Sequence, residues 1–306
     1  MLVTQVAQML KSCDQVLTRD ILASPKHILV ATDMVDLDCL LPHVIAQAKA
    51  SGSKVTMAHA IYPLYVASLE TAVVPSDYEA TLVREVRRKL DDAVHQMAAE
   101  GIHCDVTVRI GGAGEVIREE LSRSHSSRLI MGTHGRGKLR QFALGSVAHE
   151  LITKVGVPIF VVGPHVRDGA RNASPRRILH PVSFVGGYQE NCKLALDIAT
   201  TYGAELTLLH VLEKSEVDST NPDRSITWAR NTLGQVIAEL PENTAVVHTK
   251  VLFGQVAAEI LKTATEIAAD WIVLSTDEGS QSGFFKETRA FEVLANSHCP
   301  VLTLGR

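Results

Sequence analysis

The sequence predicts an α/β protein built from two repeated domains, each with a five-stranded parallel sheet. Short apolar segments occur in the same order in both halves of the 306-residue chain, and amphipathic helix-length segments lie between them. Strands that alternate with helices imply right-handed crossovers and a parallel sheet covered on both faces. The repeat is as long as a domain, which excludes a solenoid with units of roughly 20–50 residues.

Four pairs of apolar segments mark the predicted strands. They are β-branched or leucine-rich and short, as buried strands are. In chain order the pairs are HILVATDM (27–34) with RILHPVSF (177–184), KVTMAHAI (54–61) with ELTLLHVL (205–212), RLIMGT (128–133) with WIVLST (271–276), and VPIFVVG (157–163) with CPVLTLG (299–305). Each half therefore reads β-α-β-α-β-α-β-α-β.

The helix predicted after the second strand illustrates how the helices are identified. Ser76 and Glu79 have capping-box spacing, and Gly101 stands where a C-terminal cap is expected. The apolar residues between them share one helical face: Leu82, Val86, Leu90, Ala93 and Met97.

A polar stretch rich in Gly, Pro, Asn and Arg, residues 164–176, is the predicted linker between the halves. We therefore expect three parts: an N-terminal helical extension at 1–24, a first domain at 25–165 and a second domain at 174–306.

Composition excludes several functional classes. A formal net charge of -4 argues against nucleic-acid binding and a polybasic membrane anchor. No apolar run approaches the roughly 18–20 residues of a membrane span, and the amphipathic N-terminus does not resemble a secretory signal. The five cysteines are scattered, which favours buried, unreactive thiols in a reducing compartment over disulfides or a zinc site. We expect a cytoplasmic protein.

A glycine-rich, basic segment between a strand and a helix is the main candidate for a binding site. The segment SRLIMGTHGRGKLRQFALGSVAHELI (127–152) follows the fourth strand, and ligands bind beyond the carboxyl ends of parallel strands. Glycines allow a ligand to approach the backbone, and the helix that opens at Gly145-Ser146 offers free N–H groups to an anion. Arg136 and Lys138 add positive charge at the rim. This chemistry suits phosphate groups.

The pattern Gly132-x2-Gly135-x9-Gly145-Ser146 resembles the G-2x-G-9x-G-[ST] signature of ATP-binding universal stress proteins. The segments ILVATD, MGTHGRG, GSVAHELI and VPIFVV are also similar to that family. The resemblance is strong over residues 27–163 and weaker over residues 177–306. The chain therefore resembles a tandem universal stress protein with two Rossmann-like domains, similar to the adenine nucleotide alpha hydrolase fold.

The resemblance implies an ATP site in the first domain, with ADP or AMP as alternatives. A divalent cation, Mg²⁺ or Mn²⁺, would sit on the phosphates rather than on a protein cluster, so we expect neither a protein metal site nor catalytic residues. By position, alanines border the base, an aspartate lies near the ribose, and the glycine loop and helix start hold the phosphates. His134 either contacts the γ-phosphate or points to solvent. The candidate nucleotide-binding residues are Ala31, Asp33, Ala60, Gly132, His134, Gly135, Arg136, Gly145, Ser146 and Val147.

The second half departs from this signature. Ser275 replaces Gly132, Glu278 replaces Gly135, and Glu287-Thr288 replaces Gly145-Ser146, while Ser183 replaces Asp33. Glutamates repel phosphate at close range, and side chains at glycine positions block a close approach. We expect the second domain to bind no nucleotide, or a different ligand.

Other motifs fit less well. Gly132-THGR-Gly137-Lys138 lacks the Ser or Thr of a P-loop, because Leu139 follows. His149-Glu150 lacks the second histidine of a zinc-protease helix, since Thr153 fills that position. We interpret Gly111 as a tight turn into a helix, and His59 and His210 as partly buried structural histidines beside the cleft.

Three classes of function remain open. We favour a nucleotide-dependent regulator with slow or no hydrolysis, because no convincing general base accompanies the anion donors unless His134 or Asp33 serves as one. The alternative is a scaffold that binds no nucleotide and pairs its fifth strands edge to edge, as family dimers do. A true enzyme is the third class. For the first two we expect a homo-oligomer and a regulatory protein partner that the sequence does not identify.

Overall fold

The computed structural model describes residues 22–62, 78–133, 144–166, 173–184, 186–214, 217, 221–240, 245–275 and 283–304. The predicted extension at 1–24 lies outside them, apart from its last three residues. So do Ser76 and the loop that contains His134, Gly135 and Arg136.

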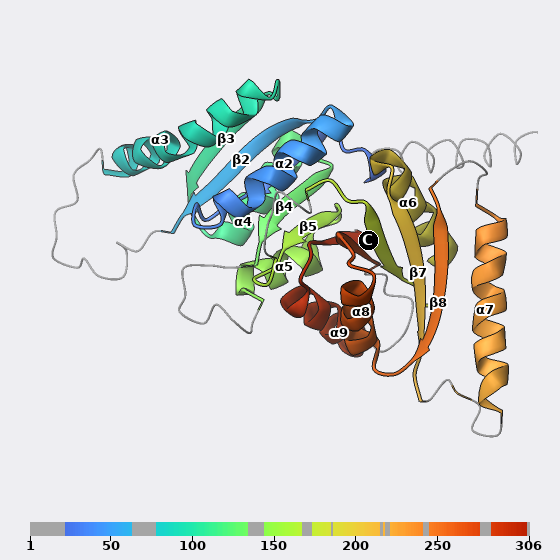
Figure 1. Cartoon of the computed structure of the whole chain (residues 1–306). Helices are drawn as coiled ribbons and strands as arrows, with labels where there is room; N and C mark the ends of the chain where they lie inside the picture. The colour runs from blue at the N-terminus through green and yellow to red at the C-terminus, as the bar shows by residue number, and fades with distance from the viewer. Residues whose placement is uncertain are drawn as a thin grey trace, which may run out of the picture.

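The order of elements confirms two five-stranded α/β units. The first unit comprises β1 (His27–Ala31), α2 (Leu37–Ser51), β2 (Lys54–Ile61), α3 (Tyr78–Ala99), β3 (Cys104–Ile110), α4 (Ala113–Ser124), β4 (Arg128–Gly132), α5 (Ser146–Lys154) and β5 (Ile159–Val162). The second comprises β6 (Arg177–Pro181), α6 (Tyr188–Tyr202), β7 (Glu205–Leu212), α7 (Pro222–Ala238), β8 (Val247–Phe253), α8 (Val256–Glu266), β9 (Trp271–Ser275), α9 (Gly283–Asn296) and β10 (Val301–Leu304). Figure 1 shows the two units side by side, the first in blue to green and the second in yellow to red.

The ten strands form one sheet in the order β3-β2-β1-β4-β5-β10-β9-β6-β7-β8. Strands within each unit pair in parallel, and β5 and β10 join the units by antiparallel pairing. The edge-to-edge pairing predicted for the fifth strands thus exists within a single chain. Strands that correspond in the sequence repeat also have corresponding neighbours in the sheet. Strand β1 pairs with β2 and β4, and its counterpart β6 pairs with β7 and β9.

Two apolar layers cover the sheet, because neighbouring residues of a strand point to opposite faces. Ile28 and Val30 belong to the layer formed with α2, α3, α6 and α7. Leu29 belongs to the opposite layer, formed with α4, α5, α8 and α9. Each layer contains buried residues from both units. Both faces of the parallel sheet are therefore covered, as the strand patterns predict.

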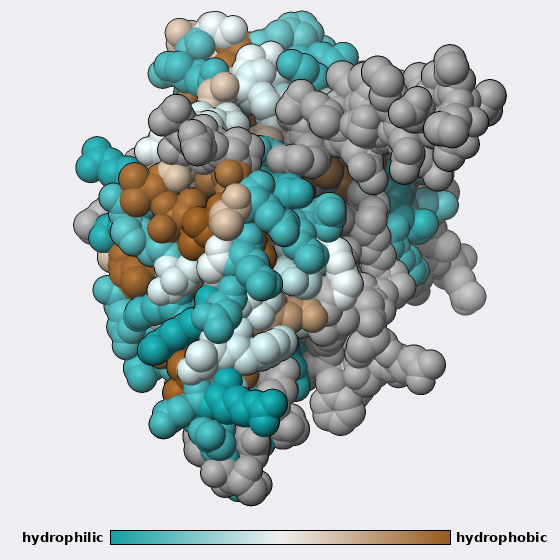
Figure 2. Space-filling view, turned by 90° about the vertical axis from the view of Figure 1, so that its right-hand side faces the viewer, coloured by the Kyte–Doolittle hydropathy of each residue, from teal (hydrophilic) through white to brown (hydrophobic). Residues whose placement is uncertain are grey.

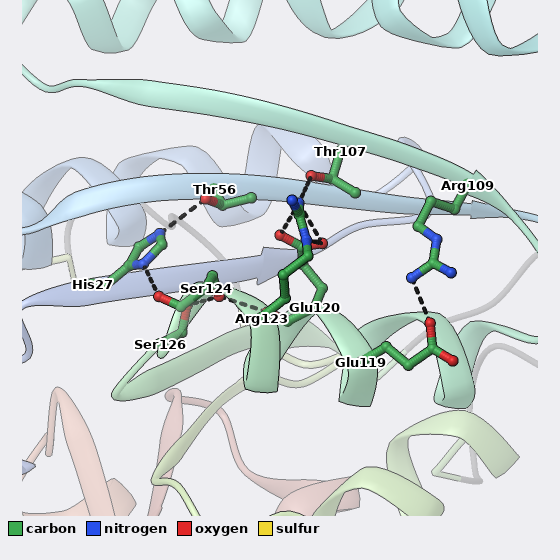
Figure 3. Close-up of polar contacts among 9 residues, drawn as sticks. All are labelled: His27, Thr56, Thr107, Arg109, Glu119, Glu120, Arg123, Ser124 and Ser126. Carbon is green, nitrogen blue, oxygen red and sulfur yellow. Dashed lines mark hydrogen bonds and ion pairs between the residues drawn. The ribbon is translucent and has the colours of Figure 1, made fainter.

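Helix α4 is fixed over the sheet by polar as well as apolar contacts (Figure 3). The His27 ring, on β1, bridges the Ser124 carbonyl at 2.8 Å and the Thr56 hydroxyl at 2.9 Å. Glu120 is almost fully buried and accepts hydrogen bonds from the guanidinium of Arg123. The buried polar groups beneath α4 are thus paired, which buried polar groups require.

Some apolar surface remains on the side of the molecule that carries α7 and β8, which Figure 2 views directly. Trp228 on α7, Val246 next to β8 and Phe253 at its end are exposed. On the edge strand itself, His248 and Lys250 interrupt the apolar run, and charges at sheet edges discourage pairing with another chain. Across the described parts of the chain, no helix is long and apolar enough to cross a membrane.

The prediction that all thiols are buried is wrong for Cys39, which is exposed near the start of α2. Cys192 and Cys299 are buried, and burial raises the pKa of their thiols to about 12 and about 11. Cys39 precedes the buried Leu40 on the amphipathic α2 and falls on its outer face. Sequence composition does not predict which of two neighbouring helix residues faces the core and which faces solvent.

Because two histidines are buried, we expect the free energy of unfolding to decrease in acid. Burial lowers the pKa of His43 and His180 to about 4, whereas the unfolded chain takes up these protons near 6.5. The free energy of unfolding should therefore fall as the pH drops from 6.5 to 4, by up to about 3 kcal/mol per histidine. We expect His43→Phe, beside the Phe160 ring, to flatten this dependence in chemical denaturation series. His95→Gln, at an exposed site, serves as the control, and equal pH slopes for all three proteins would contradict the prediction.

Candidate functional site

Thr32, Asp33 and Asp36 shape the turn between β1 and α2. The Asp33 carboxylate accepts hydrogen bonds from the N–H groups of Val35 at 2.9 Å and Asp36 at 3.3 Å. The Thr32 hydroxyl accepts from the N–H of Met34 and donates to Asp36 Oδ1. These bonds hold Met34 at a φ of 72°, which is uncommon for a residue other than glycine. The turn therefore places two carboxylates at the carboxyl end of β1.

Asp36 reaches across to Gly132 at the end of β4. A Cβ on Gly132 would collide with Asp36 Oδ2 and lie 3.1 Å from its Cγ. The bare backbone at Gly132 thus has a structural reason that sequence reasoning missed: it leaves room for a partly buried carboxylate. The motif T-D-x-x-D (residues 32–36) is the sequence feature that could have predicted this contact, because its second aspartate lies at the same sheet edge as Gly132.

The environment of Asp36 disfavours its charge. Its pKa is raised to about 6, mainly by burial and also by the neighbouring Asp33 carboxylate, while the hydrogen bond from Thr32 opposes the rise. The folded protein therefore holds this proton to a higher pH than the unfolded chain. The contribution of Asp36 to stability is present below about pH 4 and is lost as the pH rises through about 6.

Backbone bonds connect the end of β4 to the start of α5. The N–H of Thr133 bonds to the Val162 carbonyl at 3.2 Å, and the N–H of Gly145 bonds to the Thr133 carbonyl at 3.3 Å. The first helical bond of α5 runs from the N–H of His149 to the Gly145 carbonyl, and Gly145 itself supplies no side-chain cap. The first N–H groups of the helix therefore have no intrahelical acceptor. Such a helix start is suited to an anion.

The end of β2 completes this edge of the sheet. His59 is buried, and its Nδ1 lies 2.8 Å from the Thr32 carbonyl. This agrees with the structural role predicted for it. The alanines predicted to border a base, Ala31 and Ala60, are half-buried at the ends of β1 and β2. The N–H of Gly111 bonds to the Ile61 carbonyl, so β3 ends at the same level.

The described site residues therefore lie at one edge of the first unit's sheet. A chain of contacts runs from Asp36 to Gly132, then through Thr133 to Gly145. Ser146 and Val147 are exposed at the start of α5. His134, Gly135 and Arg136 lie outside the described residues. Among those described, no group of three or more His, Cys, Asp or Glu side chains could hold a metal ion.

The equivalent edge of the second unit is built differently. Ser275, which replaces Gly132, accepts a hydrogen bond from Asn191 Nδ2 at 2.7 Å. Ser183, which replaces Asp33, is exposed. Glu278 and the side chains of Glu287 and Thr288 lie outside the described part of the chain, so repulsion by these acids stays a prediction.

The contact between Asp36 and Gly132 predicts a strong coupling. Gly132→Ala should destabilise the protein by about 1–2 kcal/mol, because the new methyl displaces Asp36 and breaks its bond from Thr32. In Asp36→Gly the same substitution should cost little, because the colliding side chain is gone. Urea denaturation of the two single variants and the double variant measures this coupling. Additive effects would contradict the contact.

Comparisons with known proteins agree with the two-unit fold. A universal stress protein of Synechocystis sp. is 27% identical over 150 residues, covering 44% of this chain and 96% of that protein. Two solved structures of universal stress proteins match nearly the whole chain. The protein from Archaeoglobus fulgidus has a TM-score of 0.66 at 20% identity and covers 92% of this chain and 98% of that one. The Pseudomonas aeruginosa protein has a TM-score of 0.64 at 18% identity, covering 92% and 94%. At such identities these structures support the fold alone.

The model of the universal stress protein family matches the chain twice, at residues 25–163 and 175–304. The two matches together span most of the sequence and contain both five-stranded units. The chain therefore belongs to the universal stress protein family, as a tandem member.

Proposed function

We propose that the first unit binds ATP and that the chain acts as a nucleotide-dependent regulator with slow or no hydrolysis. The observation that carries the proposal is the linked edge of the first unit. There, the Asp33 turn, the bare backbone at Gly132 and the open start of α5 are joined by short contacts. Family membership and the glycine signature of residues 132–146 support the same ligand.

Each part of this edge matches one part of a nucleotide. The half-buried Ala31 and Ala60 provide a flat, uncharged border for a base. The carboxylate of Asp33 is fixed by backbone N–H groups, which suits it to accept hydrogen bonds from ribose hydroxyls. The N–H groups at Ser146 and Val147, which precede the first intrahelical bond of α5, suit the phosphates. A cation such as Mg²⁺ or Mn²⁺ would be bound by the phosphates.

The described groups near the helix start, which do not include His134, favour slow hydrolysis. Phosphoryl transfer to water needs a residue that positions the water and charge that stabilises the transition state. His149 follows the helix start, but its ring stacks on Phe291 of the second unit with centroids 4.5 Å apart. The His149 ring is therefore fixed by packing against the second unit and is not placed to position a water. The Asp33 carboxylate already accepts two backbone hydrogen bonds in the turn.

A scaffold without nucleotide is the second candidate, favoured by the pairing of β5 with β10. The contact that would join two single-unit chains is already made inside this chain. This pairing needs no ligand. A titration with nucleotide separates the two functions.

Equilibrium titration with labelled ATP should give about one site per chain. Gly145→Glu should abolish binding, because a carboxylate would then lie beside the helix start, and even a Cβ there comes within 3.2 Å of the Thr133 carbonyl. Asp33→Asn, which keeps the oxygen that accepts the turn bonds, should weaken binding by about tenfold through loss of a charged acceptor. A saturating nucleotide at 100 times its Kd should stabilise the wild type by about 2.7 kcal/mol.

Gly156→Glu is the matched control. Gly156 is exposed beyond the other end of α5, and a Cβ there meets no atom within 4 Å. The same change of residue and charge should leave ATP binding intact. Two equal sites per chain, or no binding by the wild type, would refute the proposal, and the second result would favour the scaffold.

A further inference from the structure

Two carboxyl groups lie close together at the carboxyl end of β1. The Thr32 hydroxyl donates to Asp36 Oδ1 at 2.8 Å, and Asp36 Oδ2 lies against Gly132, in the space that a Cβ would fill. Asp33 is near enough to act on Asp36 both as a charge and as a hydrogen-bond partner, and both effects favour a proton on Asp36. A neutral Asp36 can therefore donate this proton to Asp33, as one of two carboxyl groups that share a site does.

The elements around Asp36 provide no described cation that compensates its charge. Within the described ranges no ion pair reaches Asp36, while Arg136 and Lys138 belong to the loop outside them. The other described groups that can titrate here are the exposed Asp38 and Cys39 in the first turn of α2, His59 at the end of β2 and His149 on α5. The His59 ring contacts the Thr32 carbonyl, and the His149 ring stacks on Phe291.

The equivalent edge of the second unit has neither acid. Ser183 replaces Asp33, and the segment that corresponds to Asp36 contains Gly186 and Gly187. The two carboxyl groups therefore occur only in the unit that carries the intact glycine signature.

An anion bound in the first unit would lie close to these acids. Gly132, which Asp36 touches, is followed by Thr133, whose carbonyl accepts the N–H of Gly145 at the start of α5. Phosphates held at that helix start would bring more negative charge to an edge that already carries Asp33 and Asp36. Like charges at short range disfavour ionisation of the carboxyl group, so an anion favours the neutral form of Asp36.

We propose that ATP binding in the first unit takes up a proton at Asp36, so that the site binds the nucleotide tightly in mild acid and more weakly as the pH rises. This regulation rests on the proposed function, because it needs an anionic ligand at the start of α5. The proton comes from the solvent and is held between Asp36 and Asp33.

The direction of the effect follows from the two protonation equilibria. In the free protein the pKa of Asp36 is about 6, so below this pH the carboxyl group is already neutral and binding needs no proton. Bound phosphates raise the pKa further. Between the free and the bound pKa values the affinity should fall by up to about tenfold per pH unit, and above the bound value it should level off.

The test compares the wild type with Asp36→Asn by titration with labelled ATP and Mg²⁺. The amide keeps the oxygen that accepts from Thr32 and stays neutral at every pH. The terminal phosphate also titrates near pH 6, so the ratio of the two Kd values is the quantity to measure. At about pH 5.5 the two should agree within about twofold, and at about pH 8 Asp36→Asn should bind at least about fivefold more tightly. Asp38→Asn, the same change at an exposed site of the same helix turn, should follow the wild type.

Calorimetry in two buffers of different ionisation enthalpy near neutral pH counts the protons taken up. The wild type should take up a few tenths of a proton more per nucleotide than Asp36→Asn. Equal pH profiles or equal proton uptake would overturn the inference while leaving the proposed function intact. If neither protein binds ATP at any pH, the proposed function itself is refuted. Should Asp36→Asn fail to melt cooperatively, Asp36→Ala takes its place in the same comparison.

Discussion

The antiparallel pairing of β5 with β10 is the contact on which the rest of the structure depends. Each unit alone would end in an exposed edge strand, and such edges tend to pair with other chains. Here Phe160 lies opposite Leu302, and these residues hold equivalent positions in the two repeats. His149 and Phe291, also equivalent, stack on each other. Contacts between equivalent residues are typical of a symmetric dimer interface, here formed within one chain.

Large side chains are buried in the middle of the sheet, close to the strands that join the two units. The Phe160 ring meets the edge of Trp271, which also meets Tyr202 of α6. Arg128, the counterpart of Trp271, is fully buried and donates to the Gln47 side chain and the carbonyls of Leu22 and Ala23. A buried cation needs such acceptors to offset the water it loses. Arg128 thus anchors the chain that precedes β1 to the first unit.

Much of this architecture is predictable from sequence, because period-2 and period-3.6 patterns report burial directly. The strands beginning at His27 and Arg177 share the pair Ile-Leu at their second and third positions, and both occupy the equivalent place in their units. The glycine spacing likewise predicts which edge carries the site.

Side-chain contacts between segments distant in sequence were not predictable in the same way. The need for glycine at 132 depends on Asp36, almost a hundred positions earlier, and the stacking of Phe184 on His210 depends on two different strands meeting at one edge. No local pattern encodes either contact. The loop with His134, Gly135 and Arg136 stays a prediction, because it lies outside the described residues.

Helix α5 contributes both to the proposed phosphate site and to the contact between the two units. Its first turn carries the N–H groups suited to phosphate, and His149, on its next turn, packs against α9 of the second unit. A ligand shifts a conformational equilibrium only by the difference between its affinities for the two states. A nucleotide bound at the first turn of α5 would act as a regulatory signal through this helix if the position of α5 differed between bound and free protein. Any such movement changes the His149–Phe291 stack, because the helix is short and the ring lies one turn from the phosphate end. The second unit would then receive the signal through the packing of Phe291 against His149.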